Sequence, residues 1–554
     1  MRNTLWDNNA EQEEPRKLGL LLLLCLAWLI PGLVGHDPWK TSEAISIGIV
    51  QHIVQSGEWL VPTLAGEHAL SFGPLYYWTA AAFAHVFSWA LPVHDAARLA
   101  SGFYIALSLW AIAMAARELY GPTMQRLALA LLIGSVGLLA HAHEMVTDTA
   151  LLAGYAIVLW GFALSARRST LAGVLIGLGV GVAFLSRGVV PLVVVIVCAT
   201  VLPVFRNWRT RRYAYTMLIA FIVCLPFLAF WPWLLHHFAR SAFFWWWRVE
   251  NVPLITKFSF ASARSEIFYF IRLMPWFAWP VMPIALWTLW GYRTRLLYET
   301  RFQLPLVFFG ITFLFTGLSA EARDINLLPV LLPLTLLAVP GAETLKRGAA
   351  NALGWFGIMT FGLLAILAWF AWISLMSGYP ERFYTHILQL QPGFVPHFGW
   401  LAFVFALFLS VLWLLPLRDS FRSGRRAVFH WAAGVTLAWG LGNSLLLPWV
   451  DHGKRYSEVV SALQQHLPAH YNCIGSAGLG EAQRGLLYYY AGISTTRAER
   501  AEYNAYGCDL FLLQTDPRHP DARPGADWLK LWQGSRPGDK AEAFILFRQK
   551  NTPR

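Results

Sequence analysis

The chain has 554 residues, of which 57% are hydrophobic and 13% are charged, and its mean hydropathy is +0.48. A soluble chain of this length does not bury so much apolar side chain, so the composition excludes a soluble protein and indicates a polytopic membrane protein. The formal net charge of +12 fits basic loops at an anionic cytoplasmic leaflet, and because no basic stretch shows a binding motif, we expect no nucleic-acid partner.

Apolar segments alternate with basic loops along most of the chain. The segments with about the length needed to cross a bilayer are 18–35, 98–116, 126–141, 149–166, 170–186, 189–204, 213–232, 269–290, 302–318, 326–341, 352–375, 399–416 and 428–448. The positive-inside rule then predicts an all-α membrane domain over 1–450, with about thirteen transmembrane helices and a cytoplasmic N-terminus. The first segment lacks a small-residue cleavage site, so we expect it to be retained rather than removed as a signal peptide.

One further apolar run, 75–91, does not fit this count. If it crossed fully, the basic clusters at 117–126 and 206–212 would face outward. We therefore predict a juxtamembrane or re-entrant helix inside a first outer loop that spans 36–97. Full crossing is the alternative.

The stretch 36–78 within this loop gathers charge at a membrane edge. Asp37 and Glu43 follow the first span, and charge at membrane depth is costly, so acidic residues here suggest a functional site. Ile45, Ile49 and Ile53 recur every four residues, which predicts a helix that lies in the interface plane and ends at Ser56-Gly57.

The tail, 451–554, is polar and is predicted to lie outside the membrane. Helical spacing over 456–467 and short apolar runs at 472–479, 486–493, 509–513, 528–532 and 543–547 favour a small α/β domain. In an oxidising compartment Cys473 and Cys508 would either pair or remain as two separate buried thiols.

The first outer loop also resembles a known family. SGEWLVP (56–62) and PLYYW (74–78) are similar to the first outer loop of the GT-C membrane glycosyltransferases, in the branch of the protein O-mannosyltransferases and the lipid A aminoarabinose transferase. This resemblance implies the GT-C fold, the bacterial inner membrane, a periplasmic C-terminal domain, and sugar transfer from a polyprenyl-phosphate donor to a lipid, glycan or protein acceptor. It implies no cofactor beyond the lipid-linked donor.

The resemblance also implies site residues. HAHEMVTDTALL (141–152) is similar to the family's second acidic loop, so Asp148 would orient the acceptor with Glu144 nearby, or else would only cap the next helix. Asp37 or Glu43 would be the base that meets the acceptor hydroxyl.

Cationic side chains are expected on the phosphate of the donor. Arg187 in AFLSRGVVP matches a basic position of the family, and Arg323 begins a segment similar to the family's K/R-x-x-Y-L-L-P. Arg248 and Lys257 also face outward in the predicted topology, and guanidinium groups bind phosphate oxygens well. For any single one of these cations, contact with lipid headgroups is the alternative. No His, Cys, Asp or Glu spacing predicts a metal site.

The chain departs from the family pattern at polar positions. Ser42 replaces the expected acidic residue, Ser71 and Phe72 replace a Glu-Lys pair, and Asn326 replaces a tyrosine. Two hypotheses follow, namely a glycosyltransferase with altered site chemistry and a catalytically degenerate homologue that binds lipid-linked sugar or partners another transferase. A secondary transporter is disfavoured because the spans lack intramembrane charge and paired broken helices.

Overall fold

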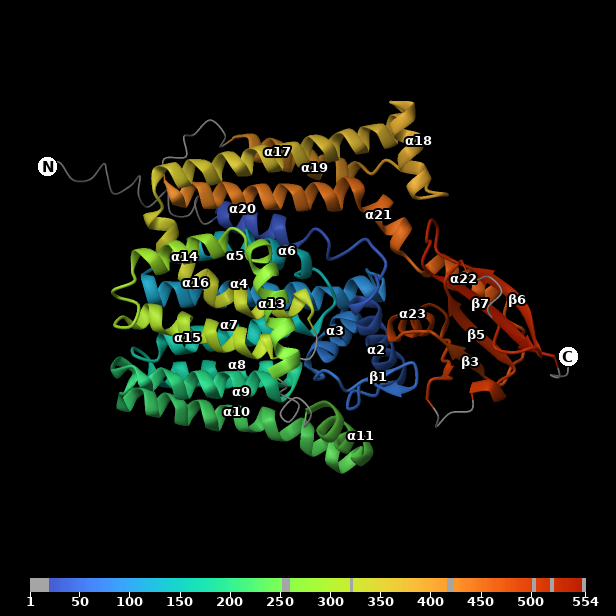
Figure 1. Ribbon diagram of the computed structural model, residues 1–554, viewed down its shortest axis with the longest axis horizontal. Helices are drawn as coiled ribbons and strands as arrows, with labels where there is room; N and C mark the ends of the chain where they lie inside the picture. Colours follow the sequence, from blue (N-terminus) through green and yellow to red (C-terminus); the bar gives the residue numbers. More distant parts are fainter. Residues whose placement is uncertain are drawn as a thin grey trace.

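Long helices packed side by side form most of the molecule, and a small sheet domain caps one end of the bundle (Figure 1). The computed structural model describes residues 19–251, 260–318, 322–415, 423–500, 505–518 and 523–550. The main helices are Gly19–Leu29, α4 (Val93–Tyr120), α5 (Met124–Ile133), α6 (Val136–His141), α7 (Thr147–Leu164), α8 (Ser169–Arg187), α9 (Val189–Val201), α10 (Arg211–Phe238), α11 (Arg240–Trp245), α13 (Phe260–Phe277), α14 (Val281–Gly291), α15 (Thr300–Gly317), α16 (Leu328–Thr344), α17 (Arg347–Ser377), α18 (Glu381–Leu390), α19 (Trp400–Leu414), α20 (Gly424–Leu441) and α21 (Leu447–Lys454).

Each of the predicted apolar segments contains helix. Within the described residues, seven helices are long and apolar enough to cross a membrane, and a bent pair, Ile267–Phe277 with Val281–Gly291, would make an eighth. Four shorter apolar helices coincide with other predicted spans. The mostly helical membrane fold is therefore as expected, while the number of about thirteen crossings stays a prediction.

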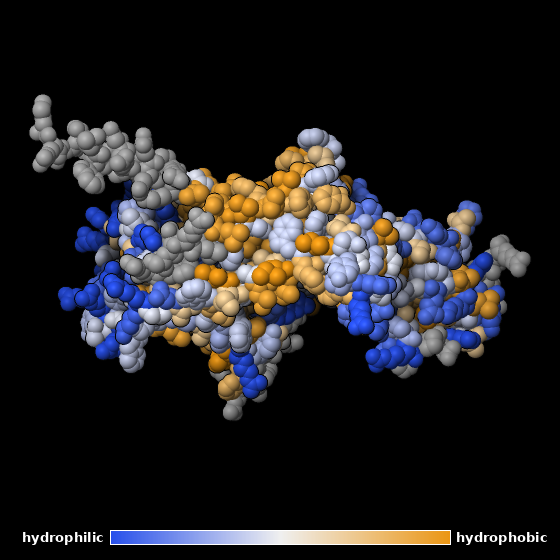
Figure 2. Space-filling view, turned by 90° about the horizontal axis from the view of Figure 1, so that it is seen from above, coloured by the Kyte–Doolittle hydropathy of each residue, from blue (hydrophilic) through white to orange (hydrophobic). Residues whose placement is uncertain are grey.

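The surface of the bundle carries the pattern of a membrane protein. On the face that Figure 2 shows, apolar side chains gather over the middle of the molecule and hydrophilic side chains gather at its two ends. Outer helices supply much of this band, for example Phe221 and Phe230 on α10 and Ile366 on α17, each more than half exposed. In water such exposure would be unfavourable, whereas lipid tails cover it without cost.

The first outer loop forms a compact unit at the end of the bundle that carries the tail. It contains α2 (Ser42–Ser56), the hairpin strands β1 (Thr63–Leu64) and β2 (Glu67–His68), and α3 (Leu75–Phe87). Ala65 and Gly66 turn the hairpin with φ of 48° and 84°, the conformation that a two-residue hairpin loop needs. With 13 residues, α3 is about 20 Å long, shorter than the hydrocarbon core of a bilayer.

The tail is an α/β unit, as its composition predicted. Its sheet has the order β4-β3-β5-β7-β6, in which β3 (Ile474–Ala477) runs parallel to β4 (Thr496–Arg497) and β5 (Leu510–Thr515). The remaining strands, β6 (Trp528–Gly534) and β7 (Ala543–Gln549), pair antiparallel. Helices α22 (Ser457–Gln465) and α23 (Glu481–Ala491) complete the unit, so the apolar run at 486–493 is mostly helix rather than strand.

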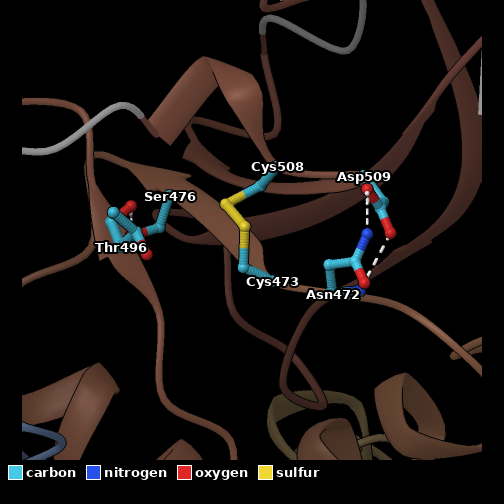
Figure 3. The surroundings of a disulfide bond; sticks show 6 residues. All are labelled: Asn472, Cys473, Ser476, Thr496, Cys508 and Asp509. Carbon is cyan, nitrogen blue, oxygen red and sulfur yellow. Dashed lines mark hydrogen bonds between the residues drawn. A yellow bond between two sulfur atoms is a disulfide. The ribbon is translucent and has the colours of Figure 1, made fainter.

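Cys473 and Cys508 form a disulfide bond (Figure 3), which confirms the paired alternative. Cys473 immediately precedes β3, and Cys508 lies two residues before the first residue of β5, the parallel neighbour of β3. Beside the bond, the backbone N–H of Asn472 donates to the Asp509 carboxylate at 2.8 Å. The sheet is thus fastened at the edge where both strands begin.

The tail is fastened to the first outer loop by packing and by charge. Helices α2 and α23 cross closely, because a Cβ added at Gly48 would lie 2.8 Å from the Cα of Gly485. The carboxylate of Glu67 on β2 meets the guanidinium groups of Arg484, Arg497 and Arg500. Burial raises the pKa of Glu67, but the hydrogen bond from Arg497 and the three positive charges outweigh it and hold the pKa below its ordinary value of 4.5.

Candidate active site

A cavity of about 320 Å³ lies between the first outer loop and the ends of several bundle helices. It combines acidic, basic and apolar side chains from segments that are far apart in the sequence. The lining residues are Ser71, Phe72, Asp148, Leu151, Tyr155, Arg187, Val190, Pro191, Val194, Glu250, Thr312, Phe315, Thr316, Arg323, Asn326 and Pro329.

An ion pair between Asp148 and Arg187 lies at the wall of the cavity. Asp148 is in the first turn of α7 and Arg187 is the last residue of α8, so the antiparallel packing of these helices brings the two side chains together. The Asp148 side chain is 6% exposed and that of Arg187 is 23% exposed, so the arginine retains access to the cavity. The guanidinium carbon of Arg187 also lies 4.5 Å from the centroid of the Phe72 ring, a cation–π contact.

The corner after Arg187 is fixed by a buried side chain. Gly188 turns the chain with φ of 71°, a conformation that residues with a Cβ rarely adopt. Asn251, only 2% exposed, accepts a hydrogen bond from the backbone N–H of Val189 at 3.3 Å and donates to the carbonyl of Trp246 at 2.9 Å. The segment after α11 is therefore held against the junction of α8 and α9.

Glu250 enters the cavity from this segment, and sequence reasoning did not identify it. The hydroxyl of Ser71 donates a hydrogen bond to Oε1 of Glu250 at 3.3 Å, so the first outer loop and the α11 segment meet at this carboxylate. No motif marks Glu250. The available signal was its position three residues after the aromatic belt at 245–247, where an acidic residue lies near the membrane surface.

A further part of the cavity wall comes from η4 (Asp324–Leu327) and the end of α15. Arg323 precedes η4, is exposed, and lines the cavity together with Asn326. The carbonyl of Asn326 accepts a hydrogen bond from the Thr316 hydroxyl at 3.4 Å, which joins η4 to α15. Of the predicted residues, the structure thus brings together Asp148, Arg187 and Arg323.

Glu43 lies elsewhere, inside a buried ion-pair network. Its side chain receives a hydrogen bond from Nε of Arg98 at 2.9 Å, and Arg98 also donates to Asp95 at 2.8 Å. The backbone N–H groups of Trp39 and Met145 donate to the same Glu43 carboxylate. Burial raises the pKa of Glu43, but the charge of Arg98 and these hydrogen bonds outweigh it and leave the pKa below its ordinary value of 4.5.

Asp37 faces the tail rather than the cavity. Its carboxylate accepts a hydrogen bond from the Ser457 hydroxyl at 2.7 Å, and its backbone N–H donates to Asp451 at 3.0 Å. Asp451 also accepts from the Trp39 indole at 2.9 Å. Asp37 therefore lies where the first outer loop joins α21 and α22.

The remaining predicted residues do not line the cavity. Glu144 contacts Nδ1 of His141 at 3.2 Å, and the other nitrogen of that ring is 3.4 Å from Asp324. Arg248 is exposed and lies 5.2 Å from the centroid of the Phe244 ring. Lys257 falls outside the described residues. In the described parts of the chain, no group of three His, Cys, Asp or Glu residues is arranged to hold a metal ion.

Comparisons with known proteins agree with the resemblance seen in the first outer loop. Residues 68–231 match the family described as dolichyl-phosphate-mannose-protein mannosyltransferase. An undecaprenyl phosphate-alpha-4-amino-4-deoxy-L-arabinose arabinosyl transferase of Pseudomonas aeruginosa (strain UCBPP-PA14) is 29% identical over 447 residues, which cover 76% of this chain and 74% of the relative. The protein with the same description from Serratia proteamaculans is 25% identical over 69% of this chain and 70% of its own length.

The fold has a solved counterpart. The crystal structure of ArnT from Cupriavidus metallidurans bound to undecaprenyl phosphate superposes with a TM-score of 0.67, at 17% sequence identity, over 96% of this chain and 97% of that one. The apo form of the same protein gives the same TM-score over 96% of this chain and 98% of that one. The tail unit and the helical bundle therefore belong to one shared architecture.

Proposed function

We propose that this chain, a GT-C membrane glycosyltransferase of the lipid A aminoarabinose transferase branch, transfers a sugar from a polyprenyl-phosphate donor. The acceptor is a lipid, glycan or protein on the periplasmic side of the bacterial inner membrane. The observation that carries the proposal is the cavity in which Arg187, Arg323 and Asp148 meet. Two guanidinium groups in one cavity suit the phosphate of a lipid-linked sugar.

An apolar groove beside the cavity supports a lipid-linked donor. This groove of about 610 Å³ lies between α3, α8 and α10 and is lined by Leu75, Trp78, Leu185, Pro226, Phe227, Ala229, Phe230, Trp231 and Trp233. Leu185 is two residues before Arg187 on α8, and Leu75 is three residues after Phe72. A donor whose polyprenyl chain lies in this groove would therefore present its phosphate to the cationic cavity.

Within this proposal, each charged group has a role. When the bond between the anomeric carbon and the phosphate oxygen breaks, negative charge grows on the departing phosphate. Arg187 and Arg323 stabilise that charge, and fixed cations act best where charge develops in the transition state. Asp148 holds the Arg187 guanidinium in place through its ion pair. Asp37 and Glu43, whose contacts lie outside the cavity, fix the first outer loop in position.

A second candidate function is binding without transfer, by a degenerate homologue. The observation that favours it is the ring of Phe72, which covers part of Arg187 at a position where the family carries a lysine. Both candidates require the lipid to bind, so they separate only when transfer is measured.

Lipid retention tests the phosphate site that both candidates share. Protein purified in mild detergent from a bacterial host should retain a polyprenyl phosphate lipid, detectable by native mass spectrometry. The double variant Arg187→Ala, Arg323→Ala should retain at least tenfold less, because a charge-assisted contact to phosphate is worth about 1.5–3 kcal/mol. Arg518→Ala, which changes an arginine of the tail whose side chain is 80% exposed, should retain the parental amount. Equal retention by the double variant would contradict the assigned phosphate site.

A further inference from the structure

We propose that Thr312 and Tyr155 bind the sugar of the lipid-linked donor through their hydroxyl groups, and that this sugar is a single monosaccharide unit. The assignment rests on the function proposed above and adds two residues to the same site. Both residues belong to the inner wall of the cavity, which lies roughly one to two helical turns inside the ends of α7, α9 and α15. The inner wall consists of Leu151, Tyr155, Val194 and Thr312.

The hydroxyl of Thr312 is buried without a partner. Thr312 is 3% exposed, and among the described residues its Oγ1 forms no hydrogen bond. A threonine hydroxyl inside a helix commonly donates to the carbonyl four residues back, as that of Thr436 does to Ala432 at 2.9 Å. A buried hydroxyl that remains unpaired is unfavourable in a folded protein. On a cavity wall, such a group suits the binding of a polar ligand.

A second unpaired group lines the same cavity. Arg187 pairs with Asp148 through Nη2, whereas its Nε forms no hydrogen bond within the described part of the chain. A guanidinium group carries several N–H donors in one plane and can bind a phosphate through two of them. The phosphate of the donor therefore has a fixed starting point at Arg187, and the sugar bonded to it extends from there.

Tyr155 adds a neutral polar side chain further along the inner wall. Positions 148 and 155 lie on the same face of α7 and are about 10 Å apart along the helix axis. Tyr155 is 3% exposed, and Phe308 of α15 packs edge-on against its ring with 5.4 Å between the centroids. The tyrosine is thus held in place by the helix that also carries Thr312.

The size and chemistry of the inner wall suit one sugar ring. The whole cavity of about 320 Å³ is at the lower end of the range for small-molecule sites, which suits a phosphate with one monosaccharide. Leu151 and Val194 offer apolar contact to the C–H groups of the ring, and Thr312 and Tyr155 offer hydrogen bonds to its polar groups. A few polar groups on a mostly apolar wall are typical of sites that select a small ligand.

The test uses limiting amounts of membranes from a strain that lacks the gene, which supply donor and acceptor, with purified full-length protein added back. Sugar incorporation into the envelope fraction is followed by mass spectrometry. Thr312→Val and Tyr155→Phe each remove a hydroxyl and should each lower the initial rate by about 2- to 10-fold, the effect of one lost hydrogen bond. The double variant should be slower by about 5- to 100-fold. Polyprenyl phosphate retained on purification should stay at the parental level, because the arginines that bind it are unchanged.

Thermal unfolding separates a sugar contact from a structural role. Because the Thr312 hydroxyl has no hydrogen-bond partner in the described protein, Thr312→Val should unfold at the parental temperature or above it. Thr436→Val is the matched control, since Thr436 is also 3% exposed but donates to the carbonyl of Ala432. We expect the control to transfer sugar at the parental rate and to be no more stable than the parent.

Four results would overturn the assignment. A double variant whose rate is within about twofold of an active parent would show that the two hydroxyls bind water only, and it would leave the transferase assignment intact. Joint loss of transfer and of retained lipid would place Thr312 and Tyr155 in the lipid site instead. Slower transfer by Thr312→Val with an unfolding temperature below that of Thr436→Val would make Thr312 a structural residue. An inactive parent protein would refute the proposed function and this inference together.

Discussion

Arg98 is the residue on which the first outer loop depends. It is completely buried, its guanidinium is shared between Glu43 and Asp95, and it also donates to the carbonyl groups of Leu33 and His36. Such a group is costly to bury unless its charge and its donors are matched. The exit of the first span is therefore joined to α2 and α4 at a single side chain.

Removing the Glu43 charge should destabilise the protein. Glu43→Gln would leave Arg98 with Asp95 as its remaining described acidic partner, and breaking a buried ion pair costs about 3–5 kcal/mol, so we expect a loss of about 3 kcal/mol at pH 7. The measurement is thermal unfolding in detergent, with Glu58→Gln as the control. A Glu43→Gln protein as stable as the control would contradict the assigned role.

The same prediction has a definite pH dependence. Because the pKa of Glu43 in the folded protein lies below its ordinary value of 4.5, the carboxylate contributes its full stability above about pH 4.5. That contribution is lost as the pH falls through the lower folded pKa. The difference in stability between parent and Glu43→Gln should therefore be constant near neutrality and shrink only below pH 4.5.

From the sequence, individual residues were singled out for a site, and three of them line one cavity, while their roles stay predictions. Asp148, Arg187 and Arg323 were expected in the site and they meet in one cavity. Asp37 and Glu43 were expected as bases because acidic residues gather at a span exit, but Arg98 lies 55 positions after Glu43 and no local pattern joins them. Glu250 was missed because its position depends on Asn251 reaching back 62 residues to Val189. Three of the four departures from the family pattern, Ser71, Phe72 and Asn326, line the cavity, so most of the changed polar positions are gathered there.

Among the helices, the α7–α8 pair governs the geometry of the site. The two helices touch backbone to backbone, because a Cβ added at Gly154 would lie 2.8 Å from the Gly179 carbonyl and one added at Gly179 would lie 2.6 Å from the Gly154 carbonyl. Small residues permit this approach in membrane bundles. Since Asp148 begins α7 and Arg187 ends α8, the same contact sets the distance across their ion pair.

A single methyl group at this contact should disturb the site from a distance. Gly179→Ala places a Cβ against backbone rather than against a flexible side chain, so the helices must separate, at a cost of about 1–3 kcal/mol. We expect a lower unfolding temperature together with reduced lipid retention, because Arg187 moves with α8. Gly310→Ala is the control, since its Cβ would meet nothing within 4 Å, and it should be neutral or slightly stabilising. Equal behaviour of the two variants would refute this role for the glycine contact.

Helices could be predicted from the sequence where interactions between neighbouring residues determine them. Apolar runs of bilayer length became helices because an apolar environment leaves the backbone no other hydrogen-bond partner. The bend of 98° between the helices at 267–277 and 281–291 was not predicted, since a single apolar stretch of sufficient length covers both. The helix over 75–91 was anticipated as a separate element, and α3 indeed ends at Phe87 before the chain turns into α4.

For the whole molecule, the tail and the first outer loop behave as one assembly. Glu67 with its three arginines, the Lys40–Glu542 ion pair and the α2–α23 contact join segments more than 400 residues apart. Composition predicted that a tail domain exists, and its two cysteines left a disulfide as one of two alternatives, which the structure decides in favour of the bond. The position of the tail domain against the first outer loop could not be predicted. The three arginines are spread over 484–500, and no local pattern connects them to Glu67, their common partner in the fold. The tail thereby holds the loop whose residues Ser71 and Phe72 line the cavity.

We expect that a sugar is transferred from a polyprenyl phosphate in the cavity of Asp148 and Arg187. The most direct measurement is the mass profile of envelope glycolipids and glycans from a deletion strain that carries the parent, Asp148→Asn, Arg187→Ala or Arg518→Ala. The parent and Arg518→Ala should restore a species heavier by one sugar, and the two cavity variants should restore at least tenfold less of it. Equal restoration by all four proteins would show that this cavity is not the transfer site, and absence of such a species with the parent would refute sugar transfer by this protein.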